Sequence, residues 1–256
     1  MLKSTIPAVR QAALAILTFA FIALSVSPGN AQGDQGYTTK AARAILIDAA
    51  TGAVLFQQRA DELAPPASMS KLMTLAVLFK AIKEGKVSTS DEYTMSVNAW
   101  RKGGAPSRTS AMMVPVNTTA TVGDLIRGIA IQSGNDACIA VAEAMAGSEA
   151  AFAKLMTQEA RRIGLTKSTF GNATGLPNEN QLMTMRELAL LADYLIKEYP
   201  DQYPVFGQKE FLYRKHKFYN RNPLLFLDIG ADGLKTGHTN EAGYGLVGSA
   251  VRDGKR

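Results

Sequence analysis

The chain has 256 residues, of which 46% are hydrophobic and 20% charged, so it can bury one substantial core with at most a small extra lobe. The formal net charge of +6 suits an anionic envelope polymer, but we find no basic run with interleaved aromatic residues and expect no nucleic-acid partner. The single cysteine, Cys138, excludes an internal disulfide framework. Because Cys138 stands in an apolar helical pattern with no nearby histidine, we interpret it as a buried residue and not as a catalytic thiol.

The first residues have the pattern of a secretory signal peptide. Lys3 and Arg10 precede an apolar stretch over residues 12–26, and small residues follow as far as Ala31. An uncleaved membrane anchor is the alternative, but the stretch is shorter than the roughly 20 apolar residues that a bilayer span prefers. We therefore expect residues 1–31 to be removed by cleavage after Ala31. The protein would then be exported to the cell envelope, in the periplasm or on the outer face of the cytoplasmic membrane.

A flexible start and a hairpin are predicted next. Residues 32–42 are polar and contain glycine, which is typical of a flexible segment, and one domain is expected over residues 43–256. The β-prone runs 44–48 and 53–57 are joined by a Thr-Gly turn and predict a hairpin.

A largely apolar helix is predicted from Ala67 or Ser68. Two prolines before it preset the chain for a helix start, and Gly85 supplies a stop. The helix begins with the motif Ser68-Met-Ser-Lys71. Free backbone N–H groups and the positive end of the helix dipole favour developing negative charge at Ser68.

The Ser68–Lys71 spacing suits nucleophilic catalysis, because a serine hydroxyl is a poor nucleophile until a base takes its proton. Residues three apart lie on one helical face, with Cβ atoms about 5–6 Å apart. Burial and a nearby cation such as Lys235 would lower the pKa of Lys71 so that its amine can act as that base. A surface lysine after an N-cap serine is the alternative when the motif is taken alone.

A second motif, Ser133-Gly-Asn135, falls between helical patterns. Glycine permits a tight turn, which would place Ser133 to relay protons to a leaving amine and Asn135 to hold a substrate carbonyl. As an isolated tripeptide it is equally well a turn that links helices. Residues 99–115 are rich in glycine, proline and serine and predict a long loop beside the site. The helical patterns cover residues 122–131, 137–145 and 149–163.

The last third of the chain predicts one helix and several strands. Thr184 and Glu187 form a capping-box pattern that opens a helix through Ile196. After Pro204, aromatic and β-branched residues alternate with charges up to Leu212. Neighbouring strands are expected at residues 234–239 and 245–251.

The third motif, Lys235-Thr236-Gly237, stands on the first of these two strands. A strand edge with glycine lets an extended peptide approach and pair by β-addition. Lys235 and Thr236 can then hold a carboxylate. The backbone N–H after Gly237, together with that of Ser68, would form an oxyanion hole in which one good donor contributes roughly 3–4 kcal/mol.

In this order, the three motifs resemble the signature of the D-alanyl-D-alanine carboxypeptidases, the low-molecular-mass penicillin-binding proteins of serine peptidase family S11. Further stretches that are similar to the family are Pro66–Thr74, Ile131–Cys138, Asn172–Pro177 and Asp232–Tyr244. The resemblance covers about residues 37–256. It implies an α+β fold, an αβα sandwich of the DD-peptidase/β-lactamase superfamily with an antiparallel sheet.

The resemblance also implies the reaction and the roles of the site residues. Ser68 would attack the penultimate D-Ala carbonyl of a peptidoglycan stem peptide ending in D-Ala-D-Ala, terminal D-Ala would leave, and water would hydrolyse the acyl-enzyme. β-Lactams would acylate the same serine as covalent inhibitors. The implied catalytic residues are Ser68, Lys71 and Ser133, and the implied substrate-binding residues are Asn135, Lys235, Thr236, Gly237 and His238. The N–H groups of Ser68 and His238 would be the oxyanion donors. No metal or cofactor is expected, since His216 and His238 lack a ligand cluster.

The end of the sequence predicts a C-terminally truncated domain. Asp253-Gly254 is a strong hairpin signal, yet only two residues follow it; a flexible tail is the alternative. In the family further strands follow, then an arginine that assists carboxylate binding, a closing helix and usually a β domain with an amphipathic anchor. Membrane association would arise through that absent part, and activity is expected of the parent protein.

Three other functions remain open at this point. A DD-endopeptidase of the same family shares all three motifs. A class A-like β-lactamase needs an E-x-x-L-N loop for fast deacylation, and none is found between Asn135 and Lys235. A non-catalytic wall-binding paralogue is disfavoured by the intact nucleophile and both lysines.

Overall fold

The computed structural model describes residues 37–256, and the predicted signal peptide lies outside the described residues. The α-helices are α1 (Lys71–Lys83), α2 (Val97–Gly103), α3 (Val122–Arg127), α4 (Asn135–Ala146), α5 (Glu149–Arg162) and α6 (Met185–Glu198). The strands are β1 (Ala44–Ile47), β2 (Val54–Gln58), β3 (Glu92–Thr94), β4 (Thr119–Thr121), β5 (Glu210–Tyr213), β6 (His216–Tyr219), β7 (Ala231–Thr239) and β8 (Gly243–Ala250). Among the described residues, no helix has the length and apolar composition that a bilayer crossing needs.

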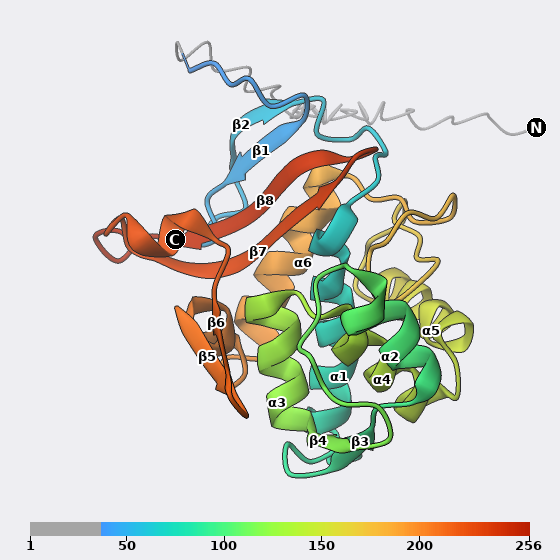
Figure 1. The fold of residues 1–256 in the computed structure, drawn as a ribbon. Helices are drawn as coiled ribbons and strands as arrows, with labels where there is room; N and C mark the ends of the chain where they lie inside the picture. Colours follow the sequence, from blue (N-terminus) through green and yellow to red (C-terminus); the bar gives the residue numbers. More distant parts are fainter. Residues whose placement is uncertain (1–36) are drawn as a thin grey trace, which may run out of the picture. The chain divides into compact units, whose positions relative to one another are not determined.

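The strands form four antiparallel pairs, β1–β2, β3–β4, β5–β6 and β7–β8. The α+β class with antiparallel strands is therefore confirmed, and so is the hairpin expected near residues 44–57 (Figure 1). In the longest pair, Lys235 is opposite Val247 and Gly237 is opposite Gly245. This register places the third motif on the strand where the sequence pattern expected it. The return strand β6 was not predicted.

Helix α1 lies at the centre of the helical part, in contact with α4, α5 and α6 (Figure 1). Its apolar residues Leu72, Leu75 and Phe79 are fully buried, as expected for a central helix that is apolar on most faces. The helix ends at Lys83, and Gly85 follows with a φ of 68°, a conformation that glycine adopts without a Cβ clash. The expected start and stop are thus confirmed to within a few residues.

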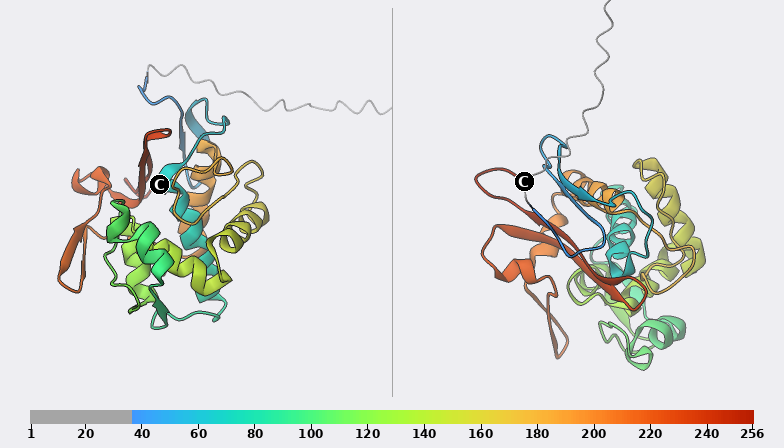
Figure 2. Two further views of the ribbon diagram at one scale, coloured as in Figure 1. Left: turned by 45° about the vertical axis from the view of Figure 1, so that its right-hand side comes forward. Right: turned by 90° about the horizontal axis from the view of Figure 1, so that it is seen from above.

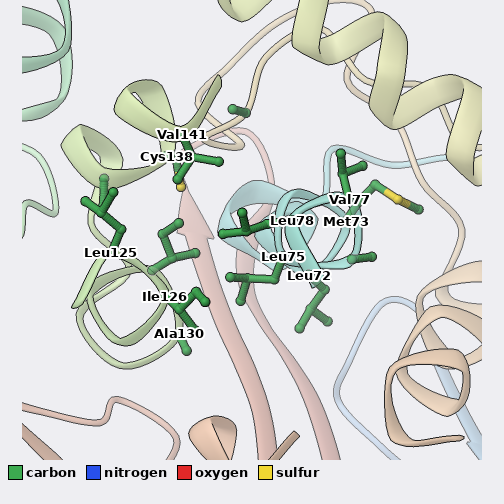
Figure 3. Close-up of a cluster of buried hydrophobic side chains, with 14 of the residues drawn as sticks. Leu72, Met73, Leu75, Val77, Leu78, Leu125, Ile126, Ala130, Cys138 and Val141 are labelled. Carbon is green, nitrogen blue, oxygen red and sulfur yellow. The ribbon is translucent and has the colours of Figure 1, made fainter. Parts of the chain in front are cut away.

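The core joins α1 to α3 and α4. Figure 3 shows Leu72 and Leu75 of α1, Leu125 of α3 and Cys138 of α4 in one buried cluster. Cys138 is a free cysteine with no exposed surface, and burial raises the pKa of its thiol to about 12. Since the thiolate is the reactive form, the interpretation of Cys138 as a buried core residue is confirmed.

The prediction of a long loop over residues 99–115 is wrong in its first part, because residues 97–103 form helix α2. Ser96 caps this helix by accepting a hydrogen bond from the backbone N–H of Ala99 at 2.9 Å, a signal that the glycine and proline content of the segment concealed. A Cβ on Gly103 would lie 2.4 Å from the backbone nitrogen of Asp136. Gly103 therefore permits close packing of α2 on α4 and does not mark a loop.

The prediction of a capping box at the start of α6 is half correct. Thr184 Oγ1 accepts from the backbone N–H of Glu187 at 3.0 Å, which satisfies one free donor of the first turn. The Glu187 carboxylate, however, accepts hydrogen bonds from the N–H groups of Lys167 and Ser168 at 2.8 and 2.7 Å. This glutamate thus ties the loop before residue 170 to α6, a tertiary role that the capping pattern does not reveal.

Candidate active site

Ser68 and Lys71 meet at the junction of two helical segments. Ser68 lies in a 3₁₀ turn, η1 (Ala67–Ser70), and Lys71 is the first residue of α1. Side chains three residues apart eclipse one another in a 3₁₀ turn. Lys71 Nζ lies 3.1 Å from Ser68 Oγ, so the pairing expected from the motif is formed across the junction of η1 and α1.

Lys71 is fully buried and has three oxygen neighbours. Its Nζ donates to Asn135 Oδ1 at 2.7 Å and to the carbonyl oxygen of Thr174, and the third neighbour is Ser68 Oγ. A neutral amine can donate to the first two and accept the proton of the Ser68 hydroxyl with its lone pair. The buried amine is thereby aimed at one hydroxyl.

Burial is the largest of the effects that lower the pKa of Lys71 to about 8. The charge of Arg221 acts in the same direction, and Cys138 and Asp136 oppose it. Burial also lowers the pKa of Lys235 well below its usual value, with Lys71 and Arg221 adding to the effect. The expected direction for Lys71 is confirmed. The cation that acts on it is Arg221, which the sequence patterns did not single out.

The second motif connects a wide helical turn, η3 (Gly128–Gln132), to α4. Ser133 has a φ of 64°, in the left-handed region that strains a residue with a Cβ. Its Oγ is buried and has no hydrogen-bond partner within the described part of the chain. The hydrogen bond to Lys71 that a proton relay needs is thus not formed in this structure, and the relay stays a prediction.

Asn135 is the first residue of α4 and is held on both sides. Its Nδ2 donates to Thr109 Oγ1 at 2.9 Å, and its backbone N–H donates to the Ser110 carbonyl oxygen at 2.7 Å. With Oδ1 accepting from Lys71, Nδ2 keeps one N–H that can donate to a substrate carbonyl. Asn135 therefore positions Lys71 in addition to the role expected for it.

The third motif lies on β7 beside the nucleophile. Lys235 is buried, and its Nζ donates to the Thr236 carbonyl oxygen at 3.0 Å. A Cβ on Gly237 would lie 3.1 Å from the backbone nitrogen of Ser68, so glycine lets β7 pass directly along η1. His238 is exposed and stacks on Tyr244 with ring centroids 4.1 Å apart. In the chain, His238 directly follows Gly237, the residue at which β7 approaches Ser68.

One cavity of about 1170 Å³ reaches residues of all three motifs. Site residues among its lining are Ser68, Ser110, Ser133, Arg221, Thr236, Gly237 and His238. The Arg221 guanidinium donates to Ser110 Oγ at 2.7 Å. Within residues 37–256, no group of three or more histidine, cysteine, aspartate or glutamate side chains is arranged to hold a metal ion.

Residues 172–175 belong to the site, although the sequence patterns predicted no role for them. Asn172 Oδ1 accepts from the backbone N–H groups of Thr174 and Gly175 at 3.0 and 2.7 Å. This turn aims the Thr174 carbonyl oxygen at Lys71. The sequence does contain a signal for this turn: Asn172 is followed by Gly175 and Pro177. These residue types are typical of an asparagine-stabilised turn.

Gly175→Ala is expected to impair both stability and the site. Gly175 has a φ of 78°, and a Cβ there would lie 2.1 Å from the Ala67 carbonyl oxygen, so η1 and the 172–175 turn must separate. Gly147 is the matched control, with a φ of 76° and no atom within 4 Å of the added Cβ. Thermal unfolding should show that Gly147→Ala lowers the free energy of unfolding by about 1–2 kcal/mol and that Gly175→Ala lowers it by clearly more. Equal losses would mean that the close approach to η1 is not essential.

Comparison with known proteins supports the reading of these motifs. A family model described as D-alanyl-D-alanine carboxypeptidase matches residues 30–256. The carboxypeptidase DacC of Escherichia coli is 43% identical over 214 residues, which is 83% of this chain and 54% of that protein. The chain thus spans about half the length of such relatives.

Solved structures resemble the fold as well. The structure of penicillin binding protein 5 from Haemophilus influenzae matches with a TM-score of 0.81 and 36% identity, over 85% of this chain and 63% of that one. Penicillin-Binding Protein D2 from Listeria monocytogenes in the ampicillin-bound form matches with a TM-score of 0.71 and 31% identity, over 84% and 86% of the two chains.

Proposed function

The chain belongs to the D-alanyl-D-alanine carboxypeptidase family, peptidase family S11, and on that premise we propose that it is a serine-type D-Ala-D-Ala carboxypeptidase of the cell envelope. It removes the terminal D-Ala from peptidoglycan stem pentapeptides through an acyl-enzyme on Ser68. The observation that carries this proposal is the 3.1 Å approach of the buried Lys71 amine to Ser68 Oγ. Relatives named as carboxypeptidases support the choice of substrate.

In the proposed acylation step, neutral Lys71 takes the proton of Ser68 as Oγ attacks the penultimate D-Ala carbonyl. The negative charge that develops on the carbonyl oxygen is stabilised by the backbone N–H groups of Ser68 and His238. The free N–H of Asn135 holds a carbonyl of the stem peptide. Each of these groups lies on η1, α1, α4 or β7, so the packed core holds them in place before substrate binds.

Release of D-Ala needs a proton on the leaving amine and a partner for the terminal carboxylate. That carboxylate binds at the edge of β7, to Lys235, Thr236 and Gly237, the last of which lines the cavity. Ser133 Oγ, which has no competing partner in the described residues, passes the proton from Lys71 to the amine. A water molecule then attacks the ester with Lys71 again as base, which restores the Ser68 hydroxyl.

The test is mass spectrometry of the protein incubated with a stem pentapeptide and then with penicillin. Loss of one D-Ala and a persistent penicillin adduct on Ser68 are expected. Cleavage of cross-linked dimers with an intact pentapeptide would favour a DD-endopeptidase. Rapid release of hydrolysed penicillin would favour a β-lactamase. An unchanged peptide and the absence of an adduct would favour a non-catalytic wall-binding protein.

The rate of acylation should rise with pH, with a midpoint at about pH 8, and then level off. A lysine loses its proton as the pH rises, and a pKa of about 8 leaves about a tenth of Lys71 neutral at pH 7. Because the charge of Arg221 lowers this pKa, Arg221→Gln should move the midpoint of penicillin acylation to higher pH. Arg101→Gln, an exposed change on α2, is the control and should leave the midpoint in place. A profile that does not move with Arg221→Gln would contradict Lys71 as the titrating base.

A further inference from the structure

Gln181 is a buried side chain that the proposed mechanism does not use. It belongs to the connection between α5 and α6, which Figures 1 and 2 show beside the first turn of α1, and it is 2% exposed. Its Oε1 accepts hydrogen bonds from the backbone N–H groups of Gly171 and Asn172 at 2.8 and 3.0 Å. Its Nε2 donates to Ser70 Oγ at 2.9 Å. The side chain thus joins the start of the 172–175 turn to η1.

The partners of Gln181 require an amide. Two N–H donors face its oxygen, so that side of the group must be an acceptor. On the other side, Ser70 Oγ donates its own proton to the Ala67 carbonyl oxygen at 3.0 Å, so towards Gln181 it can only accept. An ionised carboxylate offers acceptors alone, and an apolar side chain offers neither. The position therefore requires an acceptor and a donor on the same side chain.

The two segments that Gln181 joins carry two of the oxygen neighbours of Lys71. Ser68 lies on η1, with its Oγ 3.1 Å from Lys71 Nζ. Thr174 lies in the turn, and its carbonyl oxygen accepts from the same Nζ. The direction of the amine lone pair therefore depends on the spacing between η1 and the 172–175 turn.

Gln181 provides the hydrogen-bonded link between these segments. Thr74 Oγ1 donates to the Ala173 carbonyl oxygen at 2.8 Å, but this bond ties the turn to α1. Gly175 lets the turn approach η1 closely, since a Cβ there would lie 2.6 Å from Ser70 Oγ. Within residues 37–256, no hydrogen bond joins η1 directly to residues 171–176. The bridge through Gln181 is therefore the polar contact that sets their spacing.

We propose that Gln181 is a positioning residue for acylation, because its bridge between η1 and the 172–175 turn keeps the Lys71 amine directed at Ser68 Oγ. This inference rests on the proposed function, since it concerns the same serine and lysine. Misplacement of a reacting group by about 1 Å can cost about 10²-fold in rate, even when the substituted residue lies outside the chemistry.

The first test separates the rate of acylation from the binding of penicillin in the full chain. Gln181→Met keeps a long unbranched side chain but removes all three hydrogen bonds. Stopped-flow acylation at saturating penicillin should be about 10²-fold slower. The dissociation constant of the initial complex should stay the same, because the groups proposed to hold the ligand lie on α4 and β7.

Glu159→Met is the matched control. Glu159 is also a buried side chain, and on α5 it accepts hydrogen bonds from Lys80 and Arg162, both at 2.8 Å. This variant should lose stability in thermal unfolding and acylate at the unsubstituted rate. Unchanged acylation in Gln181→Met, or a loss that Glu159→Met reproduces, would overturn the inference and leave the proposed function in place. An unsubstituted chain that forms no adduct would contradict the proposed function, and the inference with it.

The second test uses a pH dependence that a loss of stability alone would not produce. Gln181→Glu introduces a carboxyl group that, when protonated, accepts at one oxygen and donates at the other, as the amide does. Its ionised form has no proton to donate to Ser70 Oγ. The acylation rate of Gln181→Glu relative to the unsubstituted chain should therefore rise as the pH is lowered from 9 to 6, whereas that of Gln181→Met should not. A relative rate of Gln181→Glu that does not change with pH would contradict the bridge to Ser70 and overturn the inference.

Discussion

Ser68→Ala is expected to lower D-Ala release by about 10⁶-fold, the scale on which loss of the serine nucleophile acts in other serine hydrolases. The hydroxyl is the only group at this position that can form the ester, and the methyl group of alanine keeps the volume of η1. Within residues 37–256, the hydrogen bond to Lys71 is the only side-chain hydrogen bond that is removed, so the fold should persist. Release of D-Ala from a pentapeptide and the mass of the penicillin-treated protein are the measurements.

Ser90→Ala is the control for this change, because Ser90 is exposed and far from the motifs in sequence. It should leave both D-Ala release and the penicillin adduct intact. A penicillin adduct on the Ser68→Ala protein would mean that another nucleophile carries the reaction, and the assignment of the site would then be wrong.

Lys71→Met is expected to slow acylation by about 10²- to 10⁴-fold, the usual contribution of a general base. Methionine keeps a long side chain in the buried position but offers no lone pair of a comparable basicity. Lys71→Arg separates charge from basicity, since a guanidinium stays protonated throughout the accessible pH range. If Lys71 acts as the base, both variants should lose the rise of the rate with pH.

Stopped-flow acylation by penicillin between pH 6 and pH 10 measures this loss directly. Lys83→Met is the control on the same helix, because Lys83 lies at the exposed end of α1 and pairs with Glu198 at the surface, where ion pairs contribute little. Retained acylation in Lys71→Arg, with its pH dependence intact, would show that the lysine supplies charge and not a proton acceptor. Melting temperatures distinguish such effects from unfolding.

Local sequence patterns were sufficient to predict a helix or strand wherever the residues that determine it lie close together in sequence. The β1–β2 hairpin, the extent of α1 and the strand that bears Lys235 follow from turn residues and hydrophobic spacing, which act over a few positions. Helix α2 was missed for a related reason. Its glycine is required by a tertiary contact with α4, and local rules interpret the same glycine as a loop signal.

Glu187 illustrates the opposite error. Its position three residues after a capping threonine predicts a reciprocal capping contact, which is a local interaction. In the structure, its carboxylate instead accepts hydrogen bonds from the backbone N–H groups of Lys167 and Ser168. Either arrangement gives the Glu187 carboxylate a backbone N–H donor, and the packing of the loop onto α6 decides which donor it has.

For the site, the sequence by itself determined which groups are proposed to carry the chemistry: a hydroxyl, an amine three residues away and a lysine on a later strand, in an order typical of one family. Only the tertiary structure decided whether that amine can be a base. Asn135 and Thr174, the two acceptors that orient it, are 64 and 103 positions from Lys71. A pKa depends on burial and on charges within a few ångströms, and those neighbours come together only when the chain has folded.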